Sequence, residues 1–543
     1  MSHLPARSLR ALAALGLLAA LALAPGCARR DRPVESGNRD QILHRGLGHD
    51  LAGLDPHLAT QAGDYDVLSA LLEGLVAEDP VDLHPVPGVA ERWEISADQL
   101  TYTFTLRANA RWSNGDPVTA KDFVQSWRRM LTPSLGADNA QLLFLLQGAQ
   151  AFHQGQASFA QVGVVAPDAH TLRVTLEHPA PYFLAMLNHP AWFPVHLPTI
   201  QRYGDVADRA NPWAEPGRFV GNGPFNLVSW RSGQEIVVTK STTYWDAAQV
   251  RLQGIHFHAI DSVDAEERAF RSGQLHVTYS VSLAKLDTYR RTAPGSLRID
   301  DYLDTFFFRF NTRRAPLDDT RLRRALSLAI DRSVIAEKIL RGGQTPATSF
   351  VPPNMPGYRP PVHPAHDLAE ARRLLAEAGY GPGHPLPAIE LLYNNSEILR
   401  LVAEAIQEMW RRDLGIDVHL VNQEYKVVFA NRRTGNYQIL LSDWVADYLD
   451  ATTFLDLFRS DSGNNHTGWT APGYDVLMRR ADASADLAAR AAFLAQAEDL
   501  MLKDAPVAPI YFNTHVYLLS PAVQNWRPSP MDHIDYRHVR LEH

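Results

Sequence analysis

Residues 112–124 have the sequence WSNGDPVTAKDFV, in which a turn is followed directly by the start of a helix. The run 113–117, Ser-Asn-Gly-Asp-Pro, is dense in residues that favour turns. Thr119 comes next, and Asp122, three residues later, completes a capping box. Apolar side chains then recur on one helical face, at Phe123, Val124, Trp127 and Met130. The stretch predicts a surface turn that leads into an amphipathic helix.

Strands and helices are mixed on both sides of this stretch. Residues 101–107 and 170–176 alternate polar and apolar side chains, which predicts half-buried strands. A helix at 399–414 lies between predicted strands at 389–393 and 416–421. The other predicted helices are 66–75, 318–340 and 367–378. With no tandem repeat or low-complexity run, the pattern predicts an α/β or α+β protein with several lobes.

The length and composition limit the fold and the partners. The chain has 543 residues, and a single hydrophobic core stops growing at about 250–300 residues, so two or more lobes are expected. The chain is 45% hydrophobic and 21% charged, an ordinary globular profile. A net charge of -8 without a dense run of Lys and Arg argues against nucleic acid as a partner.

The N-terminal segment has the pattern of a secretory signal. Arg7 and Arg10 precede an apolar run, residues 11–24, and the small residues before Cys27 follow it. A basic start, a short apolar core and small residues are typical of an export signal. A membrane span needs about 20 apolar residues, more than this run supplies. We therefore expect residues 1–27 to be a signal peptide.

Cys27 is the only cysteine, and it stands where a lipoprotein signal places its acylated residue. Exported chains seldom carry one unpaired cysteine without a use, which favours lipidation over an incidental cysteine that is cut away. The following residues, 28–37, are polar and charged and predict a flexible tether. With no second cysteine, disulfide bonds and thiolate metal sites are excluded.

Enzyme motifs are weak in this sequence. Ser282 and Lys285 match Ser-x-x-Lys, but the companion motifs of that acyl-transfer chemistry are missing, so coincidence is favoured. The Gly-Asn-Gly at 221–223 lacks the third glycine of a dinucleotide loop, and no Walker loop, Gly-x-Ser-x-Gly or His-Glu-x-x-His is present. The chain is therefore predicted not to be an enzyme and to need no cofactor.

Two groups of titratable residues were weighed as possible metal or catalytic sites. His256 and His258 point to one face if they lie on a strand. With no third ligand nearby in sequence, surface histidines are favoured over a metal site. Asp443, Asp447 and Asp450 surround Trp444 without the spacing of a calcium loop. Acids without a supporting constellation establish no acid–base role, and the plain interpretation is a solvated loop.

From about residue 47 to the C-terminus, the chain resembles the periplasmic oligopeptide-binding proteins of ABC peptide importers. The resemblance rests on collinear blocks: LDPH (54–57), PGVAERW (87–93), WSNGDPVTAKDFV (112–124), NGPF (222–225), YWD (244–246), FRSG (270–273), ALSLAIDR (325–332), WVADY (444–448) and SDSGNN (460–465). So many blocks in order make the family resemblance specific, whereas the choice of substrate is less secure.

The resemblance implies an α/β fold, a two-lobed periplasmic-binding-protein clamshell with a hinge and an additional domain inserted in the first lobe. The implied ranges are 38–72, 195–300 and 513–543 for the first lobe, 73–194 for the added domain and 301–512 for the second lobe. In this family a short extended peptide lies between the lobes, and its backbone pairs with the protein as in strand addition. Its side chains enter hydrated pockets, where water adapts to different residues.

The resemblance also implies a binding site. Asp447 falls on a carboxylate that pairs with the α-ammonium of the ligand, and such a buried charge needs a partner because desolvating an unpaired ammonium is costly. At 4 Å and an effective dielectric constant near 20, this pair is worth about 4 kcal/mol before desolvation. The other implied ligand-lining positions are Trp444, Tyr425, Arg432, Tyr302, Asn394, Asn464 and Asn465.

Several positions depart from the family pattern. Leu441 stands for an Arg, Asp443 for a Gly and Leu399 for a His that can help to hold a ligand carboxylate, a backbone-bonding Tyr is replaced near Asn139, and two cysteines of some members fall on Asp304 and Val445. The lost basic groups and the added Asp443 make the expected site more negative. We therefore predict a preference for basic or short peptides over acidic ones.

Together these observations predict an extracytoplasmic, lipid-anchored solute-binding protein that captures oligopeptides and delivers them to the transmembrane subunits of an ABC permease. It is expected at the periplasmic or outer face of a membrane, as a monomer without metal, cofactor or nucleic acid. Two alternatives stay open. One is the same fold with a non-peptide solute, such as a metal chelate or a sugar, or with a murein peptide. The other is a receptor that senses peptides without importing them.

Overall fold

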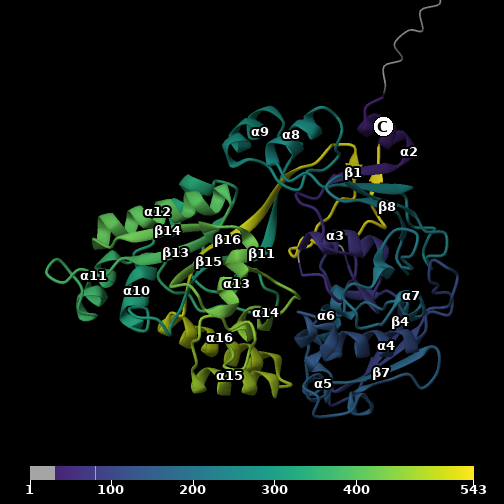
Figure 1. Cartoon of the computed structure of the whole chain (residues 1–543), viewed down its shortest axis with the longest axis horizontal. Coiled ribbons are helices and arrows are strands. Elements are labelled where there is room, and N and C mark those ends of the chain that lie inside the picture. Colours follow the sequence, from purple (N-terminus) through teal and green to yellow (C-terminus); the bar gives the residue numbers. More distant parts are fainter. Residues whose placement is uncertain (1–30, 61, 80, 543) are drawn as a thin grey trace, which may run out of the picture.

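The computed structural model describes residues 31–60, 62–79 and 81–542, so the predicted lipidation site Cys27 lies outside the described residues. The chain forms two lobes (Figure 1). Two long strands, β11 (Leu297–Phe310) and β16 (Val507–Leu518), run from one lobe into the other. Within the described residues, no helix has the length and apolarity to cross a membrane.

The first lobe is built on a four-stranded sheet in the order β1-β10-β9-β8. Its strands are β1 (Ile42–Gly46), β8 (Phe225–Arg231), β9 (Glu235–Lys240) and β10 (Gly254–His258), with β1 parallel to β10 and the other pairs antiparallel. Helices α3 (Ala62–Leu71), α8 (Val263–Arg271) and α9 (Leu286–Thr292) belong to this lobe. Near the C-terminus, β17 (Val523–Gln524) pairs with β18 (Arg540–Leu541).

The added domain has its own sheet in the order β4-β5-β7-β6. Its strands are β4 (Ala90–Ile95), β5 (Thr101–Leu106), β6 (Val164–Val165) and β7 (Thr171–Thr175), and a hairpin of β2 (Val76–Glu78) and β3 (Pro85–Pro87) leads into it. The predicted capping box is present, because the Thr119 N–H donates to Asp122 Oδ2 at 2.7 Å and starts α4 (Ala120–Leu131). The predicted apolar face of α4 is confirmed, with Phe123, Trp127 and Met130 fully buried.

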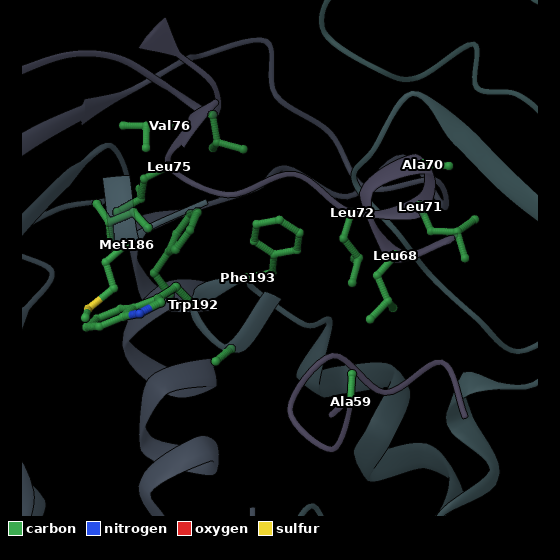
Figure 2. Close-up of a cluster of buried hydrophobic side chains, with 14 of the residues drawn as sticks. Ala59, Leu68, Ala70, Leu71, Leu72, Leu75, Val76, Met186, Trp192 and Phe193 are labelled. Carbon is green, nitrogen blue, oxygen red and sulfur yellow. The ribbon is translucent and has the colours of Figure 1, made fainter. Parts of the chain in front are cut away.

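The added domain and the first lobe share one hydrophobic core. Leu68 of α3, Leu72 directly after it and Val76 of β2 belong to the same buried cluster as Met186, Trp192 and Phe193 of the added domain (Figure 2). Met186 ends α6 (Phe183–Met186), which with α5 (Ala149–His153) and α7 (Leu197–Tyr203) completes this part of the fold. A continuous close-packed core resists relative movement, so the two parts are expected to move as one body.

The second lobe surrounds a six-stranded mixed sheet in the order β12-β16-β11-β15-β13-β14. The strands not yet given are β12 (Thr345–Pro346), β13 (Ile389–Asn394), β14 (Val418–Gln423) and β15 (Ile439–Val445). The helices are α10 (Thr320–Leu328), α11 (Leu368–Glu377), α12 (Glu397–Leu414), α13 (Tyr425–Thr434), α14 (Thr452–Leu455), α15 (Pro472–Asp482) and α16 (Leu487–Asp504). Phe308 of β11 packs against Trp410 of α12, whereas Phe307 packs against Phe350 in the cluster that contains α14–α16. Since neighbouring strand residues face opposite sides, helices cover both faces of the sheet.

The ladder between β11 and β16 is interrupted at the passage between the lobes. Residues 297–301 pair with residues 514–518, pairing stops, and it resumes at Thr305 with Phe512. The predicted lobe boundaries at 300/301 and 512/513 fall at this interruption. A break in the ladder leaves the strands free to bend, which makes this place the natural hinge; the domain ranges themselves stay a prediction.

The predicted helix at 318–340 is wrong as one element. α10 ends at Leu328, and residues 334–340 form a separate π-helical segment. Between them the guanidinium of Arg332 is buried and donates to backbone carbonyls, among them Pro509 O at 2.7 Å. These tertiary bonds compete with a continuous helix. The predicted helix at 66–75 is also shifted, because α3 spans Ala62–Leu71.

The predicted flexible tether at 28–37 is wrong for its C-terminal part. Residues 33–40 form helix α2 (Pro33–Asp40), with Pro at its first position and Glu35 in its first turn. Gly37 lies so close to the sheet that an added Cβ would come within 2.9 Å of His276 Cε1 and 3.3 Å of His44 Cδ2. The missing side chain therefore lets α2 pack on the first lobe, a contact that the local composition does not reveal.

Candidate functional site

Asp447 lies at the junction of the two lobes, in the loop between β15 and α14. Its N–H donates to Thr453 Oγ1 at 2.9 Å, and the same hydroxyl lies 3.5 Å from Asp447 Oδ2. The next residue, Tyr448, is buried in the core of the first lobe, where its ring stacks on Tyr182 with a centroid distance of 5.1 Å. The loop thus carries Asp447 from the second lobe to the surface of the first.

The carboxylate of Asp447 is enclosed without a matching cation. Burial raises its pKa to about 7, and the charge on His533 only partly offsets this. Within the residues that the structure describes, no Lys or Arg forms an ion pair with it. Asp447 keeps some accessible surface although protein surrounds it. We interpret this combination as a side chain that faces a small enclosed space rather than bulk water.

The two neighbouring acids differ from Asp447 because each faces arginine. Asp450 forms a bidentate pair with Arg490, at 2.7 and 2.8 Å. Asp443 has an exposed side chain, but the protein around it partly desolvates the carboxyl group and raises its pKa, and the nearby charges of Arg432 and Arg309 offset part of this rise. The interpretation of this segment as a solvated loop is therefore wrong for Asp450, and for Asp447 the implied role as a buried carboxylate remains the prediction.

A buried acidic group lies beside Asp443. Asp304 on β11 is 2% exposed and accepts a bond from Asn513 Nδ2 at 3.0 Å. Burial and the adjacent Asp443 raise the pKa of Asp304 well above its ordinary value. Burial and Asp304 in turn raise the pKa of Tyr302. Asp304 and Val445, the two positions of the family's cysteines, are direct partners in the ladder between β11 and β15.

Two arginines form the basic side of the same group. Arg309 on β11 is fully buried; its Nε lies 3.3 Å from Ser442 Oγ, and its Nη1 has no hydrogen-bond partner among the described residues. Arg432 on α13 lies over the ring of Phe429, and its buried Nε is also unpartnered in the described structure. Burial and the mutual repulsion of the guanidinium groups lower the pKa of Arg309 to about 10.

The remaining predicted site residues occupy different surroundings. Tyr425, at the start of α13, is 53% exposed. Trp444 is half-buried against the core of the second lobe, and its indole N–H finds no acceptor in the described parts of the chain. Asn394, at the end of β13, and Asn464 are half-buried. The amide of Asn465 donates to three carbonyls of its own loop, the shortest at 2.8 Å to Trp469 O, so we expect it to shape the loop rather than hold a ligand.

The structure therefore assembles two groups from the predicted residues. The first group consists of Tyr302, Asp443, Tyr425 and Arg432, joined by Asp304 and Arg309. The second group is Asp447 with Tyr65 and His533 of the first lobe, since burial and then the charge of Asp447 raise the pKa of Tyr65. The contacts described for Asn394, Asn464 and Asn465 are with neither group.

Sequence reasoning missed Arg309, Tyr65 and His533. Arg309 had a detectable signal, because it is the one charged residue in the run Phe-Phe-Phe-Arg-Phe at 306–310. A charge inside such an apolar strand requires a buried partner or a ligand. Tyr65 and His533 carry no such signal, since they are 468 residues apart in the sequence and meet only in the fold.

A cavity of about 90 Å³ adjoins the second group, lined by Tyr65, Glu73, Glu78, His533 and Arg537 among others. Glu73 accepts bonds from Tyr244 and from the indole of Trp245, and Arg537 lies 3.5 Å from it. A volume of this size holds a few water molecules or one small side chain. The cavity can thus take a small polar group beside Tyr65 and His533, whereas Asp447 is not one of its lining residues.

Lys285 is occupied by structural contacts. Its ammonium lies 2.7 Å from Asp264 Oδ1 and also contacts Glu267. Hydrogen bonds to these two carboxylates raise the pKa of Lys285, which holds it in the charged form. A lysine that stays protonated cannot take a proton from Ser282, which argues against the Ser-x-x-Lys chemistry.

Comparison with known proteins identifies the architecture. The family model described as bacterial extracellular solute-binding proteins, family 5 Middle, matches residues 84–466. The periplasmic oligopeptide-binding protein OppA of Salmonella typhimurium is 35% identical to this chain, and the alignment covers 98% of both proteins.

Solved structures agree with this match. The murein tripeptide binding protein MppA of Escherichia coli has a TM-score of 0.85 at 36% identity, covering 92% of this chain and 98% of that one. Haemophilus influenzae OppA in complex with the peptide RPPGFSPFR has a TM-score of 0.84 at 33% identity, covering 93% and 99%. The unliganded open form of MppA has a lower TM-score of 0.73 at 36% identity, covering 92% of this chain and 97% of that one. The predicted two-lobed α/β clamshell is confirmed, and its lobes are not arranged as in that open form.

Proposed function

Since the chain belongs to the bacterial extracellular solute-binding proteins of family 5, we propose that it captures oligopeptides between its lobes and delivers them to the permease of an ABC importer. The observation that carries the proposal is the enclosed carboxylate of Asp447, which has a pKa raised to about 7 and forms no ion pair with a Lys or Arg among the described residues. The α-ammonium group of a bound peptide supplies the positive charge that the carboxylate of Asp447 lacks as a partner. The named relatives are binding proteins, which supports a role without catalysis.

The ligand is held by its backbone and by its charged end. The segment from β15 to Asp447 offers backbone groups beside the junction of the lobes, so an extended peptide can add to it as a strand. The α-ammonium pairs with Asp447, and the peptide then continues toward Asp443 and Arg432. Because every peptide has the same backbone groups, this arrangement tolerates different sequences.

The prediction that basic peptides are preferred over acidic ones included the negative charge of Asp443 but not the charges of the residues around it. The structure sets Arg309 and Arg432 beside this carboxylate, so the local charge is close to balanced. We therefore expect a smaller difference in affinity between basic and acidic peptides than the sequence predicted. Calorimetry with peptides of equal length and different charge measures this difference.

A murein peptide is the second candidate ligand. It is supported by the unpartnered, buried N–H groups of Arg309 and Arg432, which suit an additional carboxylate on the ligand. The name of the MppA relative states that it binds a murein tripeptide. Mass spectrometry of the ligand that co-purifies with the mature protein separates the two candidates.

We further propose that the protein acts as a monomer at the extracytoplasmic face of a membrane, where a lipid on Cys27 holds it. This proposal rests on the signal-like N-terminus and on the periplasmic placement that the relatives' names state. Mass spectrometry of the N-terminal peptide of the mature protein detects the acyl groups. A mature N-terminus downstream of Cys27 would contradict the anchor.

The role of Asp447 is tested by calorimetry with a tripeptide and its N-acetylated form. We expect the parent protein to bind the free tripeptide at least 100-fold more tightly, because acetylation removes the cation. Asp447→Asn should weaken binding of the free tripeptide to the level of the acetylated one. The matched control is Asp461→Asn, an exposed acid of the loop at 460–465. Equal affinity of Asp447→Asn and the parent for the free tripeptide would falsify the proposed pairing.

A further inference from the structure

Three histidines and a glutamate meet on one face of the first-lobe sheet, far from the ligand groups. His44 of β1 is the direct ladder partner of His256 of β10, and His258 of β10 is the direct partner of Glu235 of β9. His256 and His258 are two residues apart on one strand, so they face the same side of the sheet. The four side chains therefore form a compact patch across three adjacent strands, which we call the histidine patch.

The distances within the histidine patch are short. His44 Nδ1 lies 3.1 Å from His258 Nε2, and Glu235 Oε2 lies 3.6 Å from His256 Nδ1. The ring centres are 4.9 Å apart for His44 and His256, 5.4 Å for His44 and His258, and 6.3 Å for His256 and His258. Imidazoles that share one tetrahedral ion through nitrogens at about 2.0–2.1 Å have ring centres about 5 Å apart. The three rings are already close to that arrangement.

The chemistry of the histidine patch suits a metal ion of intermediate softness. Neutral imidazole is a good ligand for Zn²⁺, Ni²⁺ and Cu²⁺, and a carboxylate can complete the coordination. The side chains of His256 and Glu235 are 29% and 18% exposed, which gives an ion an entry path.

We propose that His44, His256, His258 and Glu235 bind one divalent transition-metal ion with the properties of Zn²⁺. The close contact between His44 Nδ1 and His258 Nε2 is the pair of ligand atoms between which the ion inserts. His256 is now turned toward Glu235, and a rotation of this partly exposed ring brings its nitrogen to the ion. The sequence favoured surface histidines because the third ligand, His44, is more than 200 residues away in the chain.

Outer contacts hold the most buried ligand in place. The backbone N–H of His44 donates to His276 Nδ1 at 3.0 Å, and His276 Nε2 lies 3.0 Å from Asn38 Oδ1 of α2. His276 is fully buried and its ring stacks on His44 at 5.7 Å. The bond fixes the backbone of His44, and the stacked ring of His276 limits the positions that the His44 ring can take. The histidine patch therefore links the metal to the packing of α2 on the first lobe.

The simpler interpretation is a metal-free patch held by one bond between two imidazoles. A titration of the metal-free mature protein with Zn²⁺ and with Co²⁺ distinguishes the two interpretations. We expect one Zn²⁺ per chain by calorimetry, a rise in melting temperature, and Co²⁺ absorption of the intensity typical of tetrahedral sites. His258→Gln and His256→Gln should each weaken Zn²⁺ binding at least tenfold and remove the rise in melting temperature.

Two control variants complete the experiment. His419→Asn removes an exposed histidine of the second lobe and should leave Zn²⁺ binding unchanged. His84→Asn disrupts the exposed group of Asp79, Asp82 and His84, the one group of the described residues whose ligand atoms already lie within 4.8 Å of one another. Circular dichroism confirms that each variant is folded. Absence of Zn²⁺ binding, or binding that survives His258→Gln and is lost in His84→Asn, overturns the proposal.

Discussion

Asp55 connects three separate segments of the first lobe and added domain. Its two carboxylate oxygens lie 3.0 and 2.6 Å from the guanidinium nitrogens of Arg129, and Oδ2 also accepts from the indole of Trp213 at 3.2 Å. All three side chains are nearly or fully buried. The block LDPH, which helped to identify the family, thus contains a buried ion pair that joins α4 to the first lobe.

We predict that Asp55→Ala costs about 3–5 kcal/mol, because it leaves the buried guanidinium of Arg129 without its partner. Urea unfolding, with the midpoint and slope compared between variant and parent, measures this loss. The matched control is Glu404→Ala, which removes an exposed pair with Arg400 on α12 and should cost at most about 0.5 kcal/mol. Equal losses in the two variants would show that Asp55 is not a structural anchor.

At the same scale, the site could be predicted only where a residue falls in a recognisable block. Asp447 and Trp444 stand in such a block, and the structure places Asp447 at the junction of the lobes. Arg309 acts together with Arg432, which is 123 positions away, and His44 meets His256, which is 212 positions away. Pairings of this kind depend on strand order, and no local pattern reports that order.

Three elements meet where the lobes touch. Tyr182, directly before α6, stacks on Tyr448 of the loop before α14. Arg490 of α16 lies 5.1 Å over the ring of Tyr182 and is itself held by Asp450. These contacts join the added domain to the second lobe and are made only when the lobes are together. We expect them to stabilise the closed arrangement without touching the ligand.

Replacing Tyr182 with leucine keeps apolar bulk in the core but removes both ring contacts. An aromatic pair and a cation–π contact are each worth about 1 kcal/mol, so Tyr182→Leu should weaken peptide binding about thirtyfold. Calorimetry measures the affinity, and small-angle X-ray scattering should show a larger radius of gyration at half-saturating peptide. Tyr203→Leu, in α7 of the first lobe, is the control. Unchanged affinity and radius in Tyr182→Leu would contradict this role.

Elements were predictable where their signals are local. The capping box at Thr119 and the alternation in β5 and β7 both lie within a few residues. The break after α10 was missed because it depends on carbonyls that Arg332 reaches across the lobe. Helix α2 was missed because its eight residues are polar and become ordered only by packing against the sheet. Tertiary contacts thus override local composition at both places.

The raised pKa of Asp447 couples lobe closure of the empty protein to pH. In an open cleft, water reaches the carboxyl group and its pKa returns toward the ordinary 3.8, whereas it is about 7 in the present arrangement. The closed form therefore holds the proton more tightly. Between pH 4 and 7 the free energy of closure should become more favourable by about 1.4 kcal/mol for each unit that the pH falls, so the closed fraction rises. Above pH 7 the closed fraction should be constant.

Small-angle scattering of the ligand-free protein from pH 5 to pH 8 measures this dependence. Asp447→Asn is neutral at every pH, so it should close more readily than the parent at pH 8 although it binds peptides less tightly. Burial lowers the pKa of His533, but the contact with Glu78 and the charges of Glu78, Asp532 and Asp66 together raise it above its ordinary value. The variant retains His533 and so isolates the effect of Asp447. The same pH dependence in Asp447→Asn and the parent would assign the effect to other groups.

The C-terminus lies beside helix α2, close to the first residues that the structure describes (Figure 1). Gln41, directly after α2, exchanges two hydrogen bonds with Leu541, at 2.7 and 3.1 Å. A support that grips either terminus therefore holds the same half of the protein still. The second lobe is not held by the support. Surface-immobilised biosensors built on this chain can use either attachment, provided that the reporting dye sits on the outer face of α12.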